Sequence, residues 1–420
     1  MKKKLIALAV AGALAAPVVA SAQGTNVTIF GRVQAEYSLV DSGAPGNHSQ
    51  GALQDNARSS RWGLQITEDL GRGLKANARM EMGLNTGAGS ASTPREQWVG
   101  LSHNNWGDVK LGRVQSPFKD FAGGMTIDPF AYTTMQANGA GATMTGSANG
   151  MGSGANGFVN SALRFDSITT DGFSFAGLLM PGDSASNDPR NATGAQAPGG
   201  LGSTGMTGGR DGEFDGQAAA KYATSYMGQD ITAFGGYSRD NANVNQKAVG
   251  LRTEETWRMG ATWAYQNLKV VGQYEQIRNA IGTATCTTGA SQTANPADTL
   301  GSGQCNSAMN MGGDGSIWHV GTNYQYGNTL LVAQGGMTNA DATGAGIAGL
   351  GAAGARDARS FTIGAIHSLS KRTSLFGGYQ RVTMNSAAGA GAGTGLAEAT
   401  SLNARVGDRN TWTIGMRHNF

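Results

Sequence analysis

The sequence has little cysteine, little charge and a single long apolar run. Only two of its 420 residues are cysteine, 14% are charged and 7% are aromatic, whereas 67 are glycine, a type that usually makes up about 7% of a chain. The single apolar run, at residues 5–20, excludes a bundle of membrane helices, because each helix needs about 20 consecutive apolar residues. A β-barrel is then the structure that still lets this chain cross a bilayer. The Trp, Tyr and Phe residues spaced along the chain argue against disorder.

The N-terminus has the features of an export signal. Three lysines at positions 2–4 precede the apolar run, and Ala20–Ala22 forms a small-residue cleavage site. We therefore predict a cleaved signal peptide at residues 1–22 and one exported domain at residues 23–420, with an uncleaved anchor as the alternative. Without those lysines the 31 basic residues become 28, equal to the 28 acidic ones. A neutral mature chain excludes nucleic acid as a partner.

The two cysteines fit an exported protein in an oxidising compartment. Cys286 and Cys305 lie in one stretch rich in Gly, Thr, Asn and Ser. We predict a disulfide between them, which by the loop-entropy estimate contributes about 3 kcal/mol. Two free thiols are the alternative.

The dominant hydrophobic period of the mature chain is two. In residues 27–39 the odd positions are apolar or small, and the positions between them are mostly polar. The same alternation recurs at 74–84, 257–265 and 412–420. One face of each segment therefore meets apolar surroundings and the other meets water, which indicates strands.

Short and long connections alternate between these strands. Seven short turns, such as Glu68–Gly73, alternate with eight longer stretches rich in Gly, Ala, Ser, Thr and Asn, so sixteen strands are joined. An even antiparallel count lets the first and last strands pair and close the sheet. We predict an all-β fold, a 16-stranded antiparallel transmembrane β-barrel with short periplasmic turns and long extracellular loops. Aromatic residues at strand ends, such as Trp62 and Trp412, fit the girdles of such a barrel better than a soluble sandwich.

Several segments carry a family resemblance: Phe30–Arg32, Glu68–Lys75, Arg95–Leu101, Val109–Arg113, Leu163–Ser167 and the terminal strand ending in Phe420. They resemble the general porins of Gram-negative outer membranes, especially the trimeric β-proteobacterial type. The resemblance implies an outer-membrane homotrimer, surrounded by lipids and lipopolysaccharide, that needs no cofactor. It also implies that Phe420 is the signal read by the barrel-assembly machinery.

The resemblance also implies a pore constriction. In such porins the third extracellular loop folds into the lumen, where its acidic residues face basic residues of the wall. Here that loop runs from about residue 115 to residue 160, and its charged candidates are Lys119, Asp120 and Asp128. The basic residue often found before the sixth strand is absent, and Arg164 is the candidate that compensates for it. The full set of basic wall candidates is Arg32, Arg61, Arg95 and Arg164.

Alternation gives the facing of several of these residues independently. It turns Arg32 and Arg61 inward, whereas Arg95 shares the parity of Val99 and is placed inward by the resemblance alone. For each arginine, a solvated surface charge is the alternative. The lumen-lining candidates are Glu36, Lys75, Arg79, Glu81 and Lys110. Basic candidates outnumber acidic ones on the wall, so we predict a weak anion preference.

The sequence contains no recognisable motif for catalysis or metal binding. Gly-x-Gly-x-x-Gly recurs in the glycine-rich loops, where the glycine content explains it by chance. The five histidines are scattered, and the sequence has no zinc-protease, hydrolase-elbow or Walker pattern. We therefore expect no enzyme activity and no metal site.

A passive channel for ions and small hydrophilic solutes is the function that we expect. A substrate-specific channel stays open as an alternative and would need an aromatic track, for which the candidates are Phe118, Phe121, Phe130 and Tyr132. An adhesin or phage receptor is the other alternative and would use the long loops as binding surfaces. Conductance in a planar bilayer distinguishes a channel from a receptor.

Overall fold

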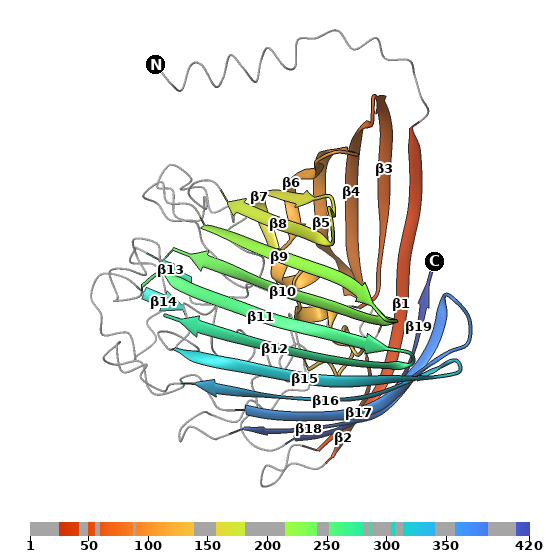
Figure 1. Cartoon of the computed structure of the whole chain (residues 1–420). Coiled ribbons are helices and arrows are strands. Elements are labelled where there is room, and N and C mark those ends of the chain that lie inside the picture. Colours follow the sequence, from red (N-terminus) through yellow and green to blue (C-terminus); the bar gives the residue numbers. More distant parts are fainter. Residues whose placement is uncertain are drawn as a thin grey trace.

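A computed structural model of the chain shows a β-barrel (Figure 1). The structure describes residues 25–41, 49–54, 59–86, 90–137, 157–180, 215–241, 252–279, 285–287, 304–306, 314–340, 358–384 and 409–420. The predicted signal peptide, residues 1–22, lies outside the described residues. No helix in the described ranges is long and apolar enough to span a membrane.

Sixteen strands, counted around the barrel, form its wall. Their strands are β1 (Asn26–Asp41), β3 (Arg61–Gly71), β4 (Leu74–Asn85), β5 (Ser90–His103), β6 (Gly107–Gln115), β7 (Phe158–Ser167), β8 (Phe173–Met180), β9 (Asp215–Tyr226), β10 (Gln229–Asp240), β11 (Glu254–Tyr265), β12 (Leu268–Arg278), β15 (Gly315–Tyr326), β16 (Thr329–Ala340), β17 (Ala358–Ser368), β18 (Thr373–Met384) and β19 (Arg409–Asn419). The short β2 (Gln50–Gln54) and β3 together occupy one place in the wall, because both pair with β1. β2 pairs with residues 36–40 of β1, and β3 pairs with residues 26–32. A separate hairpin consists of β13 (Thr285–Thr287) and β14 (Gln304–Asn306).

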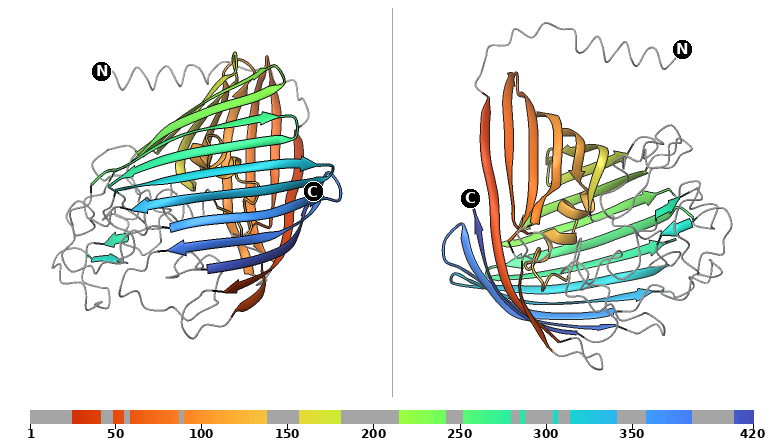
Figure 2. Two further views of the ribbon diagram at one scale, coloured as in Figure 1. Left: turned by 60° about the horizontal axis from the view of Figure 1, so that its bottom comes forward. Right: turned by 180° about the vertical axis from the view of Figure 1, so that it is seen from behind.

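The first and last strands close the barrel. β1 pairs antiparallel with β19 over Arg32–Asp41, and the two lie side by side in Figure 2. Phe420 and Gly31 exchange two backbone hydrogen bonds of 3.0 Å. The Phe420 ring occupies the space that a β-carbon on residue 31 would need, so glycine is required there. The prediction of a closed 16-stranded antiparallel barrel is confirmed.

Alternation places apolar side chains outside and polar ones inside. On β1, Val33 and Tyr37 are exposed outward, whereas Gln34, Glu36 and Ser38 are buried on the inner side. Outward aromatic residues also pair directly across neighbouring strands, with ring centroids 4.3–4.6 Å apart: Tyr237–Trp257, Tyr274–Trp318 and Tyr379–Trp412. An apolar outer face with an aromatic girdle is typical of a barrel whose outer solvent is lipid.

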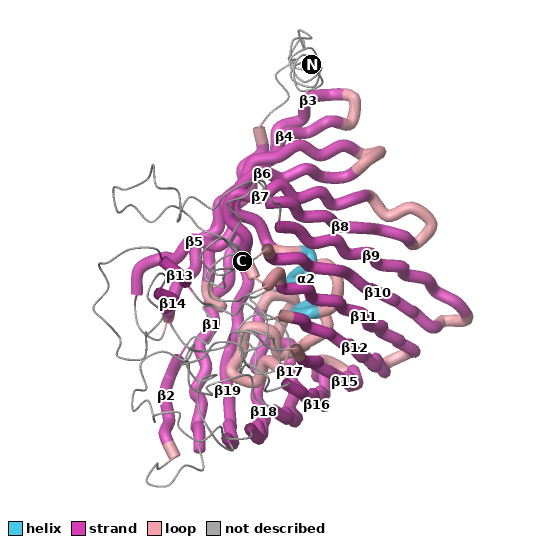
Figure 3. Tube along the Cα trace, turned by 90° about the vertical axis from the view of Figure 1, so that its left-hand side faces the viewer, coloured by secondary structure: helices cyan, strands magenta, loops and turns pink. Residues whose placement is uncertain are grey.

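The connection after β6 folds into the barrel instead of leaving it. It contains α2 (Pro117–Asp120), η2 (Gly124–Thr126) and residues 127–137, and Figure 3 shows α2 within the curve of the strands. Its buried Phe118 packs in a cluster with Phe234 and Val271 of the wall. Farther along, Phe130 packs with Val332 and Phe376. Two buried apolar clusters therefore lie between this inward loop, residues 116–137, and the inner wall.

Candidate functional site

Wall glutamines hold the inward loop in place. Four of their side chains hydrogen bond to loop backbone at 2.6–3.1 Å: Gln217 to Phe118, Gln273 to Gly124, Gln380 to Met135 and Gln34 to Tyr132. These residues belong to β9, β12, β18 and β1, so the loop is attached to widely separated parts of the wall. Each bond satisfies a backbone N–H or carbonyl group of the loop.

Arg258 on β11 fixes the first turn of the loop. Its guanidinium donates to the carbonyl oxygen of Phe118 and, at 3.0 Å, to that of Ala122. Glu275 on β12 accepts from the same group at 2.6 Å, and the side chain of Arg258 is fully buried. We did not predict Arg258 as a site residue, although its place between the outward Trp257 and Met259 puts it on the inner face.

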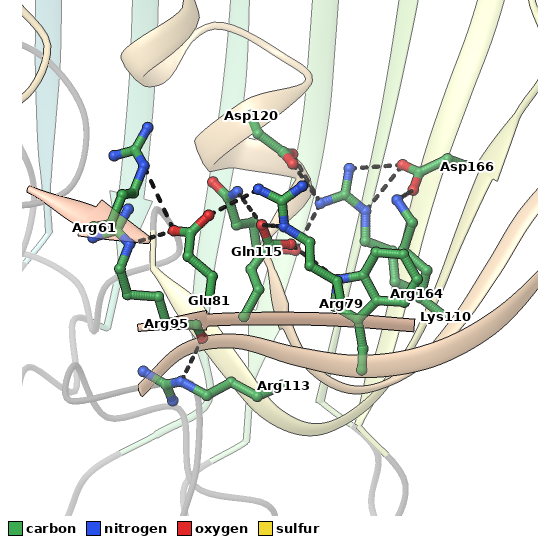
Figure 4. A network of polar contacts seen from close by, with 12 residues as sticks. Arg61, Arg79, Glu81, Arg95, Lys110, Arg113, Gln115, Asp120, Arg164 and Asp166 are labelled. Atoms are coloured by element: carbon green, nitrogen blue, oxygen red, sulfur yellow. Dashed lines mark hydrogen bonds and ion pairs between the residues drawn. The ribbon is translucent and has the colours of Figure 1, made fainter. Parts of the chain in front are cut away.

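A network of charges covers the inner wall from β3 to β7 (Figure 4). Glu81 on β4 is its centre: it pairs with Arg79 at 2.8 Å, with Arg61 at 3.7 Å and with Arg95. Arg79 also pairs with Glu96 at 3.0 Å. The structure thus brings together four of the residues that we predicted for the wall and the lumen, and it adds Glu96.

A β-bulge turns Arg95 inward. The register of β4 and β5 shifts between Met80 and Met82, so both Arg95 and Glu96 lie opposite the single Glu81. An extra residue reverses the side-chain parity on its far side. This explains why alternation alone did not give the inward facing of Arg95.

The network continues to the inward loop through β6 and β7. Lys110 pairs with Asp166 at 2.8 Å, and Arg164 pairs with Asp166 at 2.6 Å and with Asp120 of the loop at 2.8 Å. Burial raises the pKa of Asp120, while the adjacent Arg164 opposes the rise. Arg164 therefore links the wall to the loop. No group of three or more His, Cys, Asp or Glu in the described segments is arranged to hold a metal ion.

Asp128 does not face the basic wall, contrary to our expectation. Its carboxylate is buried and accepts from the backbone N–H groups of Phe130 at 2.9 Å and Ala137 at 2.6 Å. The side chain of Gln334 on β16 donates to it at 2.8 Å. Asp128 thus shapes the loop and attaches it to β16, a role that depends on the path of the loop.

Two predicted lumen-lining residues lie away from the network. Glu36 points inward, but it is buried beneath the loop and accepts from the backbone N–H of Thr134 at 3.1 Å. Lys75 lies opposite Asp69, beside the turn that joins β3 to β4, and is exposed.

Tyr132 of the loop lies among basic side chains. Four cationic groups are 4.8–5.9 Å from its ring centroid: Arg61, Arg95, Arg32 and Lys119. Arg32 also donates to the side-chain oxygen of Asn419 at 2.8 Å. Lys119 lies 3.3 Å from the ring centroid of Phe158, and burial lowers its pKa to about 8.

Arg417 on β19 completes the basic surroundings of the loop. It donates to the carbonyl oxygen of Ala131 at 2.9 Å and to Gln34 at 2.7 Å. We did not predict this residue from the sequence either. Its place between the alternating outward residues Met416 and His418 is the signal that identifies an inward side chain.

The other aromatic candidates of the loop do not form a track along the lumen. Phe118 and Phe130 are completely buried against the wall. Phe121 packs against the same cluster as Phe118. Among the four aromatic candidates, Tyr132 is the one surrounded by the charged wall residues, which argues against an aromatic path for a specific substrate.

The backbone places the two cysteines opposite each other. Cys286 and Cys305 are direct partners in the β13–β14 register. Opposite residues of antiparallel strands have Cα atoms about 4.5–5.5 Å apart, within the roughly 4.4–6.8 Å that a disulfide spans. Their side chains lie outside the described part of the chain, so the disulfide stays a prediction.

Sequence relatives of this chain are outer-membrane proteins. Residues 7–387 match the family described as Gram-negative porin. Outer membrane porin protein 32 of Delftia acidovorans is 44% identical over 120 residues, which are 28% of this chain and 33% of that protein. An outer membrane porin protein of Bordetella pertussis is 34% identical over 156 residues, 33% of this chain and 39% of that protein. The aligned parts thus span less than half the length of these relatives.

Solved structures with the same fold cover nearly the whole chain. The anion-selective porin from Comamonas acidovorans has a TM-score of 0.62 and 20% identity, covering 94% of this chain and 100% of that chain. OmpF of Salmonella typhi in complex with daunomycin has a TM-score of 0.57 and 16% identity, covering 94% and 98%. With the family match over most of its length, this chain belongs to the Gram-negative porin family, a family of outer-membrane channels and not of enzymes.

Proposed function

We propose that the protein is a passive diffusion channel for ions and small hydrophilic solutes, with a constriction that weakly prefers anions. The observation that carries the proposal is the inward loop, which is attached across the barrel and meets the charged wall at Asp120 and Tyr132. A loop in this position narrows the lumen, so that permeating solutes pass close to the wall charges. Size and charge then decide what passes, without any chemical step.

The charge balance at this level supports an anion preference. The side chains described around the constriction include four carboxylates: Glu81, Glu96, Asp120 and Asp166. The cations there are more numerous: Arg32, Arg61, Arg79, Arg95, Lys110, Lys119 and Arg164. The Debye length is about 10 Å at 0.1 M salt, so this field is partly screened and the preference is weak. The shared fold with a porin named for anion selectivity supports the same sign.

The assembled state in this proposal is a homotrimer in outer-membrane lipid and lipopolysaccharide, folded by the barrel-assembly machinery. Phe420 supports a part in assembly, because its backbone and ring both contact Gly31 at the closing seam. Purified protein should run as a heat-modifiable trimer in an unheated gel lane. A monomer mass there, with the same mass from light scattering in mild detergent, would contradict the trimer.

Reversal potentials in planar bilayers test the channel and its selectivity. We expect a weak anion preference at low salt that fades as salt rises. Arg61→Ala should move the reversal potential toward cations more than Arg252→Ala, because Arg252 lies exposed just before β11 and away from the constriction. A clear cation preference at low salt, or equal effects of the two substitutions, would overturn the proposal. Absence of any conductance would favour a receptor.

A further inference from the structure

The backbone fixes the position of Tyr132. Its φ of +67° lies in the left-handed region, which is unfavourable for a residue with a β-carbon. Gln34 donates to its carbonyl oxygen at 2.6 Å, and its own N–H donates to Gln136 at 2.7 Å. Arg417 holds the preceding carbonyl, that of Ala131, at 2.9 Å. These three attachments use the loop backbone, so the Tyr132 side chain can be changed while they stay in place.

The Tyr132 side chain lies among cations from four elements. Arg32 of β1, Arg61 of β3, Arg95 of β5 and Lys119 of α2 surround the ring. Glu81 of β4 is paired with Arg61, Arg79 and Arg95, and Glu96 of β5 is paired with Arg79. Glu36 of β1 accepts from the backbone N–H of Thr134, two residues along the loop. Arg417 of β19 lies next to Arg32 and donates to the carbonyl oxygen of Ala131.

The phenolic oxygen accepts a hydrogen bond from a charged donor. The guanidinium of Arg95 donates to it at 3.4 Å. A hydrogen bond donated by a cation favours the ionised form of the acceptor. Burial raises the pKa of Tyr132, but Lys119, Arg95 and Arg61 outweigh this and bring the pKa down to about 7. An unperturbed tyrosine has a pKa of about 10.

We propose that Tyr132 sets the strength of the anion preference by releasing and regaining one proton. The O–H bond breaks, the proton goes to water in the lumen, and the electron pair stays on the phenolate oxygen. The phenolate charge cancels one positive charge of the surrounding basic side chains, so the anion preference falls as pH rises through neutrality. The inference rests on the proposed function, because it requires that ions pass this constriction.

Lys119 is the second group that titrates near this range, with a pKa lowered to about 8 by burial. Its deprotonation would also remove positive charge as pH rises. The test therefore uses Lys119→Arg as the background, because arginine stays protonated throughout and keeps the charge at position 119 constant. The pair to compare is Lys119→Arg and the double variant Lys119→Arg/Tyr132→Phe, with Tyr326→Phe as a control. Tyr326 is strongly exposed at the β15–β16 turn.

Reversal potentials of these variants are measured in planar bilayers between about pH 6 and pH 8, on both sides of the expected titration. In Lys119→Arg the anion-to-cation permeability ratio should fall about two- to fivefold, the effect of one unit charge several ångströms away in water after screening by salt. In the wild type and in Tyr326→Phe the ratio should fall further, because Lys119 also begins to lose its charge in this pH range. In the double variant it should stay constant. Heat-modifiable gel mobility confirms that each variant is folded.

Ultraviolet difference titration of Lys119→Arg against the double variant gives a second readout. Tyrosinate absorbance that appears in the same pH range as the selectivity change supports the proposal. Tyrosinate that appears only near the usual pKa of about 10, or equal pH dependence in the two variants, overturns it. The Tyr132→Phe single variant separates the two groups. If the permeability ratio stays constant with pH in Lys119→Arg but falls in Tyr132→Phe, the effect belongs to Lys119 and the proposal is overturned. If the wild type instead prefers cations at every pH, the proposed function fails, while the absorbance titration still decides on Tyr132.

Discussion

Replacing Glu81 with glutamine removes the central carboxylate of the wall network and keeps its size. The Glu81 side chain is only 2% exposed and pairs with Arg79, Arg61 and Arg95. Glutamine carries no charge and accepts hydrogen bonds at one oxygen only. Three guanidinium groups would therefore lose their shared counter-charge, and the constriction would become more positive by one unit.

The size of the selectivity change follows from Coulomb's law. A unit charge contributes about 1 kcal/mol at 4 Å in water and about half of that at 8 Å, with opposite sign for an anion and a cation, before salt screens part of it. We therefore expect Glu81→Gln to raise the anion-to-cation permeability ratio about two- to fourfold at low salt, and less as salt shortens the Debye length.

The same substitution should lower the stability of the barrel. Removing one partner of a buried ion pair typically costs about 3–5 kcal/mol. Here the side chains of Arg61 and Arg79 are 18% and 27% exposed, so water solvates part of the released charge. We therefore expect a loss of about 1–3 kcal/mol, less than for a fully buried pair.

Reversal potentials across a salt gradient and thermal unfolding in detergent, followed by circular dichroism, measure the two effects. Glu255→Gln is the matched control, because Glu255 accepts from the outward Tyr237 hydroxyl at 2.7 Å and does not face the lumen. A shift of Glu81→Gln toward cations, or an equal shift in the control, would refute the assignment of Glu81 to the constriction.

Three further predictions concern the loop and the disulfide. Arg258→Met leaves Glu275 buried without this partner and frees two loop carbonyl groups. The free energy of unfolding should fall by about 3–5 kcal/mol, and single-channel currents should become noisier. Quiet currents at wild-type stability would contradict the anchoring role. Because burial raises the pKa of Asp120, acidification should remove its charge at a higher pH than for an ordinary aspartate, and the anion preference should rise there in the wild type but not in Asp120→Asn. Mass spectrometry of a non-reduced digest should show Cys286 linked to Cys305, and alkylation of both thiols in the native protein would exclude the bridge.

The barrel was predictable from the sequence because lipid and water impose opposite demands on its two faces. Apolar and polar residues then alternate along each strand, and this pattern is visible without knowledge of the partners. The interruption between β2 and β3 and the bulge at Arg95 were not predictable in this way. Both depend on how a strand pairs with its neighbour, and a single sequence does not contain that register.

The wall side of the site was more predictable than the loop side. Alternation identified Arg61, Arg79 and Glu81 as inward residues, and the structure joins them in one network. Alternation shows which side chains point inward but not which of them contact the loop. It therefore did not distinguish Arg258, which anchors the loop, from inward residues that do not contact the loop. The interior position of Asp128 likewise depends on where the loop crosses the barrel.

The attachment of the loop and the field of the wall use different interactions. Uncharged glutamine side chains from four wall strands hold the loop backbone, and the charged anchors Arg258 and Glu36 are buried where salt hardly reaches. In the proposed channel, by contrast, partly exposed charges such as Arg61 and Arg79 face a lumen in which dissolved ions screen them. We therefore expect salt to weaken the discrimination between ions without releasing the loop that narrows the path. The constriction should then keep its size limit under conditions in which its charge preference fades.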